Sequence, residues 1–161
     1  MTEVVECARE FLSILREEDP RAYGEILRLG RGMRLGIRYG PDRLTLTFTG
    51  EGRGGEKEGE GVAIMAEQFD ESRGLSSSPP PSGGSRLDFR CSVEPELFFQ
   101  IVDGRVLLSD AVWSRSLDIF GTYENLMKVY RIAELSLMVT RGSPAFSGVL
   151  LKLRESSFPK D

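Results

Sequence analysis

The side chains in this sequence that could carry out chemistry are two cysteines and scattered carboxylates, because the chain contains no histidine. Histidine is the commonest general base and the commonest transition-metal ligand in proteins. Its absence excludes Ser/His/Asp triads, Cys/His dyads and zinc sites built on histidine. Cys91 lies in a strand-like segment with no imidazole to activate it, so we expect it to be a small core residue. Neither Cys91 nor Cys7 is expected to be catalytic.

One glycine-rich run, residues 50–55, matches the dinucleotide-binding pattern GxGxxG. In a nucleotide site, such a turn opens a helix whose N-terminal amides face the phosphates. Here the following residues, 56–61, read EKEGEG, which is a poor helix former and adds negative charge. We therefore interpret residues 50–61 as a flexible loop and expect no nucleotide cofactor.

The carboxylates form no obvious acid–base pair. Asp103 lies where a helix is predicted to end, Asp110 lies in a predicted capping turn, and residues 17–19 form a charged run. A catalytic carboxylate needs burial that perturbs its pKa, whereas caps and charged runs are exposed. We therefore predict that the chain is not an enzyme and that it has no catalytic residue, metal site or cofactor.

Composition limits the class of protein and its partners. The length of 161 residues suits one domain, 1–161, with one core. No apolar run approaches the ~18 residues of a transmembrane segment. The net charge of −4 gives no electrostatic support for binding nucleic acid. Two cysteines are too few for a disulfide framework, and Glu3 and Glu6 stand where a secretory signal is basic, so we expect a cytoplasmic protein.

Two periodicities follow one another in the first half of the chain. Helical spacing of apolar residues predicts a first helix through Leu15, and Asp19 with Pro20 opens a second that ends at Gly30. The period then changes to two, which predicts strands at 33–39, 43–49 and 62–66. The first two strands should pair as an antiparallel hairpin with one apolar face.

The second half follows a segment of linker composition, residues 71–85, which we predict to be a flexible insertion within the single domain. Beyond it, alternation predicts strands at 87–91 and 117–121, and helical spacing predicts elements at 94–102, 110–113, from 122 onward and within 144–158. Strands and helices together indicate an α+β domain.

The long helix that starts near residue 122 is apolar on two flanks. Met127 and Tyr130 lie on the more regular apolar face, which we expect to face the sheet. Val129, Ile132 and Val139 lie on the second flank. Because that flank also needs cover, it should border either a lipid in an internal cavity or a partner subunit.

Residues 87–121 resemble the central signature of the sterol carrier protein family. Gly104 with Arg105, then Ala111, then a short strand ending at Gly121 fall at the family's spacing. The order of the predicted elements also resembles the family over nearly the whole chain. The resemblance implies a five-stranded mixed sheet with helices on one face, enclosing an apolar tunnel that holds a fatty-acyl or sterol-like molecule.

Aromatic and aliphatic residues of the second half supply the candidate wall of that tunnel. Periodicity alone indicates that these residues belong to an ordinary core. The family resemblance indicates lipid binding instead. Whether the bound lipid is transferred or presented is left open. The candidate ligand-binding residues are Phe98, Phe99, Ile101, Val102, Trp113, Phe120, Met127 and Tyr130.

Two alternatives remain open at this point. The same fold with a filled core could be an interaction module, with the long helix docking a second copy of the chain as a homodimer or docking an enzyme partner. The other alternative is an enzyme, in which this fold would form one part of a larger catalyst.

Overall fold

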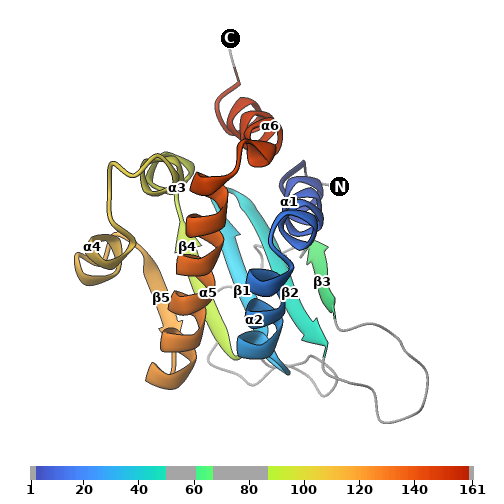
Figure 1. Ribbon diagram of the computed structural model, residues 1–161. Coiled ribbons are helices and arrows are strands. Elements are labelled where there is room, and N and C mark those ends of the chain that lie inside the picture. The colour runs from blue at the N-terminus through green and yellow to red at the C-terminus, as the bar shows by residue number, and fades with distance from the viewer. Residues whose placement is uncertain (1–2, 50–60, 67–86, 160–161) are drawn as a thin grey trace.

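The computed structural model describes residues 3–49, 61–66 and 87–159, and Figure 1 shows how their helices and strands are arranged. In chain order the elements are α1 (Glu3–Glu18), α2 (Pro20–Gly30), β1 (Arg34–Tyr39), β2 (Asp42–Thr49), β3 (Gly61–Ala66), β4 (Phe89–Val93), α3 (Pro95–Val102), α4 (Leu108–Trp113), β5 (Asp118–Gly121), α5 (Tyr123–Gly142), the 3₁₀ turn η1 (Pro144–Phe146) and α6 (Ser147–Ser157). The strands form one sheet in the order β3-β2-β1-β4-β5, with helices over one of its faces (Figure 1).

The sheet is mixed because its central strand β1 pairs antiparallel with β2 and parallel with β4. In this register Leu35 lies opposite Leu46 on one side and beside Phe89 on the other. Paired residues of neighbouring strands point to the same face, so these apolar side chains all lie toward the helices. The predicted α+β class, with a five-stranded mixed sheet and helices on one face, is confirmed.

Two glycines of the family-like segment have a steric reason. Gly104 follows the end of α3 with a φ of 77°, in the left-handed region that favours glycine. Gly121 lies beside Phe89 in the sheet, and a Cβ placed there would lie 2.8 Å from Cδ2 of that ring. The spacing from Gly104 to Gly121 thus marks a helix end and a close strand contact.

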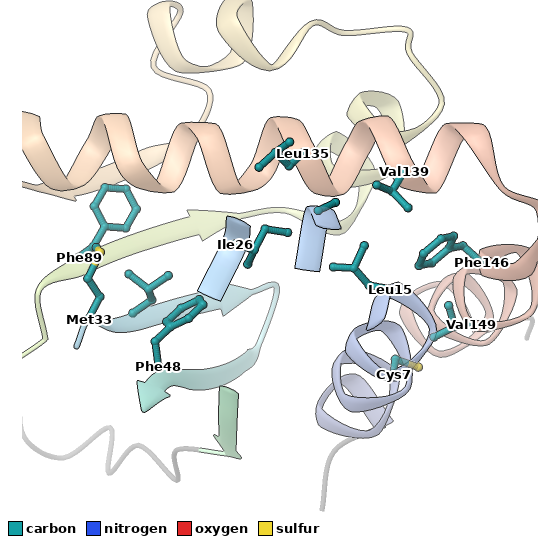
Figure 2. Close-up of a cluster of buried hydrophobic side chains, with 12 residues drawn as sticks. Cys7, Leu15, Ile26, Met33, Phe48, Phe89, Leu135, Val139, Phe146 and Val149 are labelled. Carbon is teal, nitrogen blue, oxygen red and sulfur yellow. The ribbon is translucent and has the colours of Figure 1, made fainter. Parts of the chain in front are cut away.

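The main core lies between the sheet and the helices, and Figure 2 shows ten of its side chains labelled. Ile26 of α2 and Leu135 of α5 lie above the strand residues Phe48 and Phe89. Phe146 is fully buried at the junction of α5 and α6, and its ring centroid lies 5.0 Å from that of Phe11. The C-terminal segment is therefore part of this core.

The helix and strand predictions are confirmed in kind and order, with boundaries shifted by a few residues. The strand expected at 87–91 is β4, Phe89–Val93, and the tail expected at 144–158 divides into η1 and α6. The expected loop at 71–85 lies outside the described residues, and so does 50–61 except for Gly61, where β3 begins. In the described part of the chain, no helix has both the length and the apolar character that a membrane span needs.

Candidate functional site

An apolar cavity of about 380 Å³ lies between the inner face of the sheet and the helices. Side chains from every strand except β5 and from α1, α2, α3, α4, α5 and α6 line it. The sheet contributes Leu35, Ile37, Tyr39, Leu44, Leu46, Phe48, Val62, Ile64, Phe89, Cys91 and Val93, and α1 contributes Val4, Cys7, Ala8, Phe11 and Leu12. The cavity is thus a gap left in the main core, closed by elements from both halves of the chain.

Helix α5 supplies one wall through a stripe of residues three or four apart. Thr122 caps the helix by accepting a hydrogen bond from the Asn125 amide at 3.2 Å. The lining residues of the stripe are Val129, Ile132, Ala133, Ser136, Leu137 and Thr140. Helical geometry places such residues on one face, and Val129 and Ile132 of the second apolar flank belong to it, whereas Val139 is buried in the core outside the lining.

The expected orientation of α5 was therefore wrong at Met127. Met127 stands nine residues before Ser136, which is about half a turn around the helix axis at ~100° per residue. The side chain of Met127 is accordingly 49% exposed, and Tyr130 is half-buried outside the cavity. Both flanks of the helix are apolar, so the periodicity did not distinguish the inward one.

Helix α3 is held against the cavity by a contact from the far end of α5. The guanidinium of Arg141 donates from Nη2 to the Ile101 carbonyl at 2.5 Å and from Nε to the Val102 carbonyl at 3.3 Å. These carbonyls belong to the last turn of α3, where intrahelical partners run out. The contact fixes the last turn of α3, whose Ile101 and Val102 side chains line the cavity together with Phe98.

The other predicted wall residues lie outside the cavity lining. Phe99 is buried behind Phe98, with a ring centroid distance of 5.2 Å, and the guanidinium carbon of Arg154 lies 4.5 Å from its ring centroid. Trp113 at the end of α4 is 85% exposed, and Phe120 is 71% exposed. Phe120 pairs with Arg90 on the sheet face away from the helices, because strand alternation directs Ile119 inward instead.

Sequence reasoning missed the cavity residues from the first half of the chain. It had placed Leu35, Ile37, Leu44 and Leu46 on one apolar strand face, and that face is the floor of the cavity. The alternation of apolar residues was the available signal. The prediction of the cavity wall relied on aromatic and aliphatic residues of the second half instead of on this alternation.

The cavity offers no charged side chain among the described residues that line it. Its two helical hydroxyls are satisfied within α5: Ser136 Oγ donates to the Ile132 carbonyl at 2.8 Å, and Thr140 Oγ1 donates to the Ser136 carbonyl at 2.6 Å. Hydroxyls that donate back into their own helix have no proton left for a ligand. The cavity therefore favours an apolar ligand.

Both thiols of the chain line this cavity and both are unpaired. Burial, with a smaller contribution from Asp118, raises the pKa of Cys91 to about 11. Burial also raises the pKa of Cys7, and the nearby carboxylate of Glu10 adds to the effect. A thiol in this state is a poor nucleophile near neutral pH, because the thiolate is the reactive form. No cluster of acidic or cysteine residues suited to a metal ion lies among the described residues.

Fold and cavity together define an α+β protein with an apolar cavity between sheet and helices, and the known structures similar to it include two of the sterol carrier type. One, a UbiJ-SCP2 ubiquinone synthesis protein, is 14% identical, with a TM-score of 0.49 over 82% of this chain and 88% of that chain. Another, sterol carrier protein 2 from Yarrowia lipolytica in its apo form, is 11% identical, with a TM-score of 0.47 over 87% of this chain and 91% of that chain.

A third similar structure, the sec-alkylsulfatase Pisa1 from Pseudomonas sp., is 12% identical, with a TM-score of 0.39 over 66% of this chain and only 14% of that chain. No family model matches the sequence, and no curated protein matches it. At such identities a likeness concerns the fold alone, and the function has to be argued from the cavity.

Proposed function

We propose that this protein binds a lipid or similarly apolar small molecule in its internal cavity and performs no chemistry on it. The observation that carries the proposal is the cavity of about 380 Å³, lined by apolar side chains from both halves of the chain. Ligand pockets commonly have volumes of about 300–1,000 Å³. Protein cores are otherwise close-packed, with few voids larger than a water molecule. A gap of this size is costly unless an occupant fills it.

The chemistry of the lining supports an apolar occupant over water. A buried water needs two to four polar partners, and the hydroxyls of Ser136 and Thr140 are already bonded within α5. Each methylene group transferred from water into such a cavity contributes ~0.8 kcal/mol. Desolvation therefore drives binding, and an alkyl, acyl or sterol-like skeleton is the matching ligand chemistry.

A binding role without catalysis is supported by the groups that face the cavity. The sequence has no histidine, and the two thiols at the cavity wall are held in the protonated form by burial. Transfer or presentation of the bound molecule is the role we propose. The unpaired state of both thiols supports the cytoplasm as its compartment.

A cavity-filling substitution tests this function. Ala133→Phe adds a ring to the α5 stripe that lines the cavity, whereas Met127→Phe changes an exposed position of the same helix. In a fluorescence titration with the uncharged probe N-phenylnaphthylamine, we expect saturable uptake at one probe per chain. Ala133→Phe should weaken uptake by about tenfold or more, and Met127→Phe should leave it unchanged. Absence of saturable uptake by the folded wild-type protein would refute the function.

A second function, a protein-interaction module, is favoured by one separate observation. Trp113, Phe120 and Tyr123 are 85%, 71% and 76% exposed, although aromatic side chains of this size usually avoid water. Exposed aromatic residues are enriched at binding surfaces. Docking of a second copy of the chain or of an enzyme partner near the β5 edge of the sheet is compatible with ligand binding, since these residues lie outside the cavity lining.

A further inference from the structure

The apolar cavity adjoins a second, more polar hollow where β1 turns into β2. This hollow has a volume of about 210 Å³ and shares Val4 and Tyr39 with the apolar cavity. Its remaining lining residues are Glu3, Pro41, Asp42, Pro95, Ser156 and Ser157. Val4 and Tyr39 are therefore the residues that border both the apolar cavity and the hollow.

The hydrogen bonds around Tyr39 have a defined direction. Ser157 Oγ donates its one proton to the Leu153 carbonyl at 2.6 Å, so the 2.7 Å contact between Tyr39 and Ser157 requires the tyrosine to donate. Ser156 Oγ donates to the same Leu153 carbonyl at 3.0 Å. All three hydroxyls have thus used their protons within the protein. What they offer to a ligand in the hollow is lone pairs.

Charge at the hollow acts in the same direction. Glu3 and Asp42 supply carboxylates, and no lysine or arginine lies among the described residues that line either space. The positive groups nearby are the first turn of α1, which already carries Glu3 and Glu6, and the guanidinium of Arg154 on α6, which is ion-paired with Asp103 at 3.1 Å. A ligand carboxylate or phosphate would face acceptors and negative charge without a cationic partner among the described residues that line the hollow. A hydroxyl group, in contrast, can donate to these acceptors.

We propose that the protein selects an uncharged amphiphile, an apolar chain ending in a hydroxyl group that donates a hydrogen bond to Tyr39 Oη, and discriminates against the corresponding carboxylate. The inference rests on the proposed lipid-binding function and names the ligand class that its cavity takes. The ring of Tyr39 is held in place for this role, because it meets Phe98 edge-on at a centroid distance of 5.5 Å and its residue is 5% exposed. Selection is thus a property of the hydroxyl network, while affinity comes from the cavity.

Three probes with one alkyl chain separate head-group selection from general hydrophobicity. Dodecanol carries a donor, its methyl ether keeps the oxygen without the donor, and dodecanoate carries a charge. Each competes with N-phenylnaphthylamine for the full-length protein at about pH 8. We expect dodecanol to bind about tenfold more tightly than dodecanoate and about fivefold more tightly than the ether, as one hydrogen bond predicts. Dodecanoate should bind weakest of the three.

The Tyr39→Phe variant decides whether the hydroxyl network is responsible. It keeps the ring and removes the acceptor, so dodecanol and its ether should bind equally, each measured relative to the variant's own probe uptake. The matched control is Tyr23→Phe, since Tyr23 lies on α2 outside the lining of both spaces and should preserve the preference. An unchanged preference in Tyr39→Phe, or dodecanoate binding as tightly as dodecanol, overturns the inference while probe uptake upholds the lipid-binding function. Absence of probe uptake overturns both.

Discussion

Removal of the Phe146 side chain should destabilise the whole domain, although this residue lies close to the C-terminus. Phe146 is 0% exposed, and its ring packs against the ring of Phe11 of α1 with a centroid distance of 5.0 Å. Val149 of α6, also buried, belongs to the same cluster (Figure 2). The substitution Phe146→Ala leaves a gap at the point where α1, α5 and α6 meet.

The expected cost follows from burial. A fully buried phenylalanine replaced by alanine lowers the free energy of unfolding by about 3–5 kcal/mol, and the lost ring pair with Phe11 is included in that range. For a domain of this size each kcal/mol corresponds to about 2–4 °C in Tm, so the shift should be roughly 6–20 °C. Because α6 contributes Val149, Leu150 and Leu153 to the cavity wall, probe uptake should fall as well.

Urea denaturation followed by circular dichroism measures the free energy directly. The matched control is Leu151→Ala on α6, whose side chain is 57% exposed and should cost no more than about 0.5 kcal/mol. Equal, small losses for Phe146→Ala and Leu151→Ala would show that the C-terminal segment does not belong to the core. Helix α6 would then not be part of the cavity wall.

Three further predictions concern the buried thiol and the exposed aromatic residues. The Cys91 pKa of about 11, against an ordinary 9.0, gives about a hundredfold less thiolate near pH 8, so iodoacetamide should modify Cys91 in the Cys7→Ser variant at least that much more slowly when folded than in urea. Since burial raises the folded-state pKa, the contribution of Cys91 to stability should be complete below pH 9 and should decline as pH rises toward 11, and a rise in stability over that window would contradict the assigned burial. If the exposed aromatic side is an interface between copies, Trp113→Ser should lower the mass measured by sedimentation without reducing probe uptake; a monomeric wild-type protein would reject the homodimer.

In the proposed function, the two adjoining spaces have different tasks, because one is apolar and the other is more polar. The cavity, with its apolar lining, supplies affinity in proportion to the length of chain that it removes from water. The hollow beside Tyr39 contributes little affinity, since one hydrogen bond in water is worth about 1 kcal/mol net, but it distinguishes head groups. Binding and selection can thus be changed separately, at Ala133 and at Tyr39.

The sequence by itself determined the elements and one of the strand pairings, that of β1 with β2. Alternation in 33–39 and 43–49 predicted the β1–β2 hairpin and its apolar face, because side chains of a strand alternate between two faces. Asp19 and Pro20 predicted the start of α2, where the Asp19 carboxylate accepts a hydrogen bond from the Ala22 amide at 2.9 Å. These signals are local, since each depends on residues within one or two turns of chain.

The tertiary structure alone decided which apolar residues enclose the cavity. Periodicity states which residues share a face, but helix α5 has two apolar flanks, and only its packing against the sheet turns Ile132 inward and Met127 outward. Phe98 and Phe99 are adjacent aromatic residues, yet one lines the cavity and the other packs behind it. The contact between Tyr39 and Ser157 joins residues 118 positions apart. No local sequence pattern predicts such a contact, because the contact depends on how α6 packs over the end of β1.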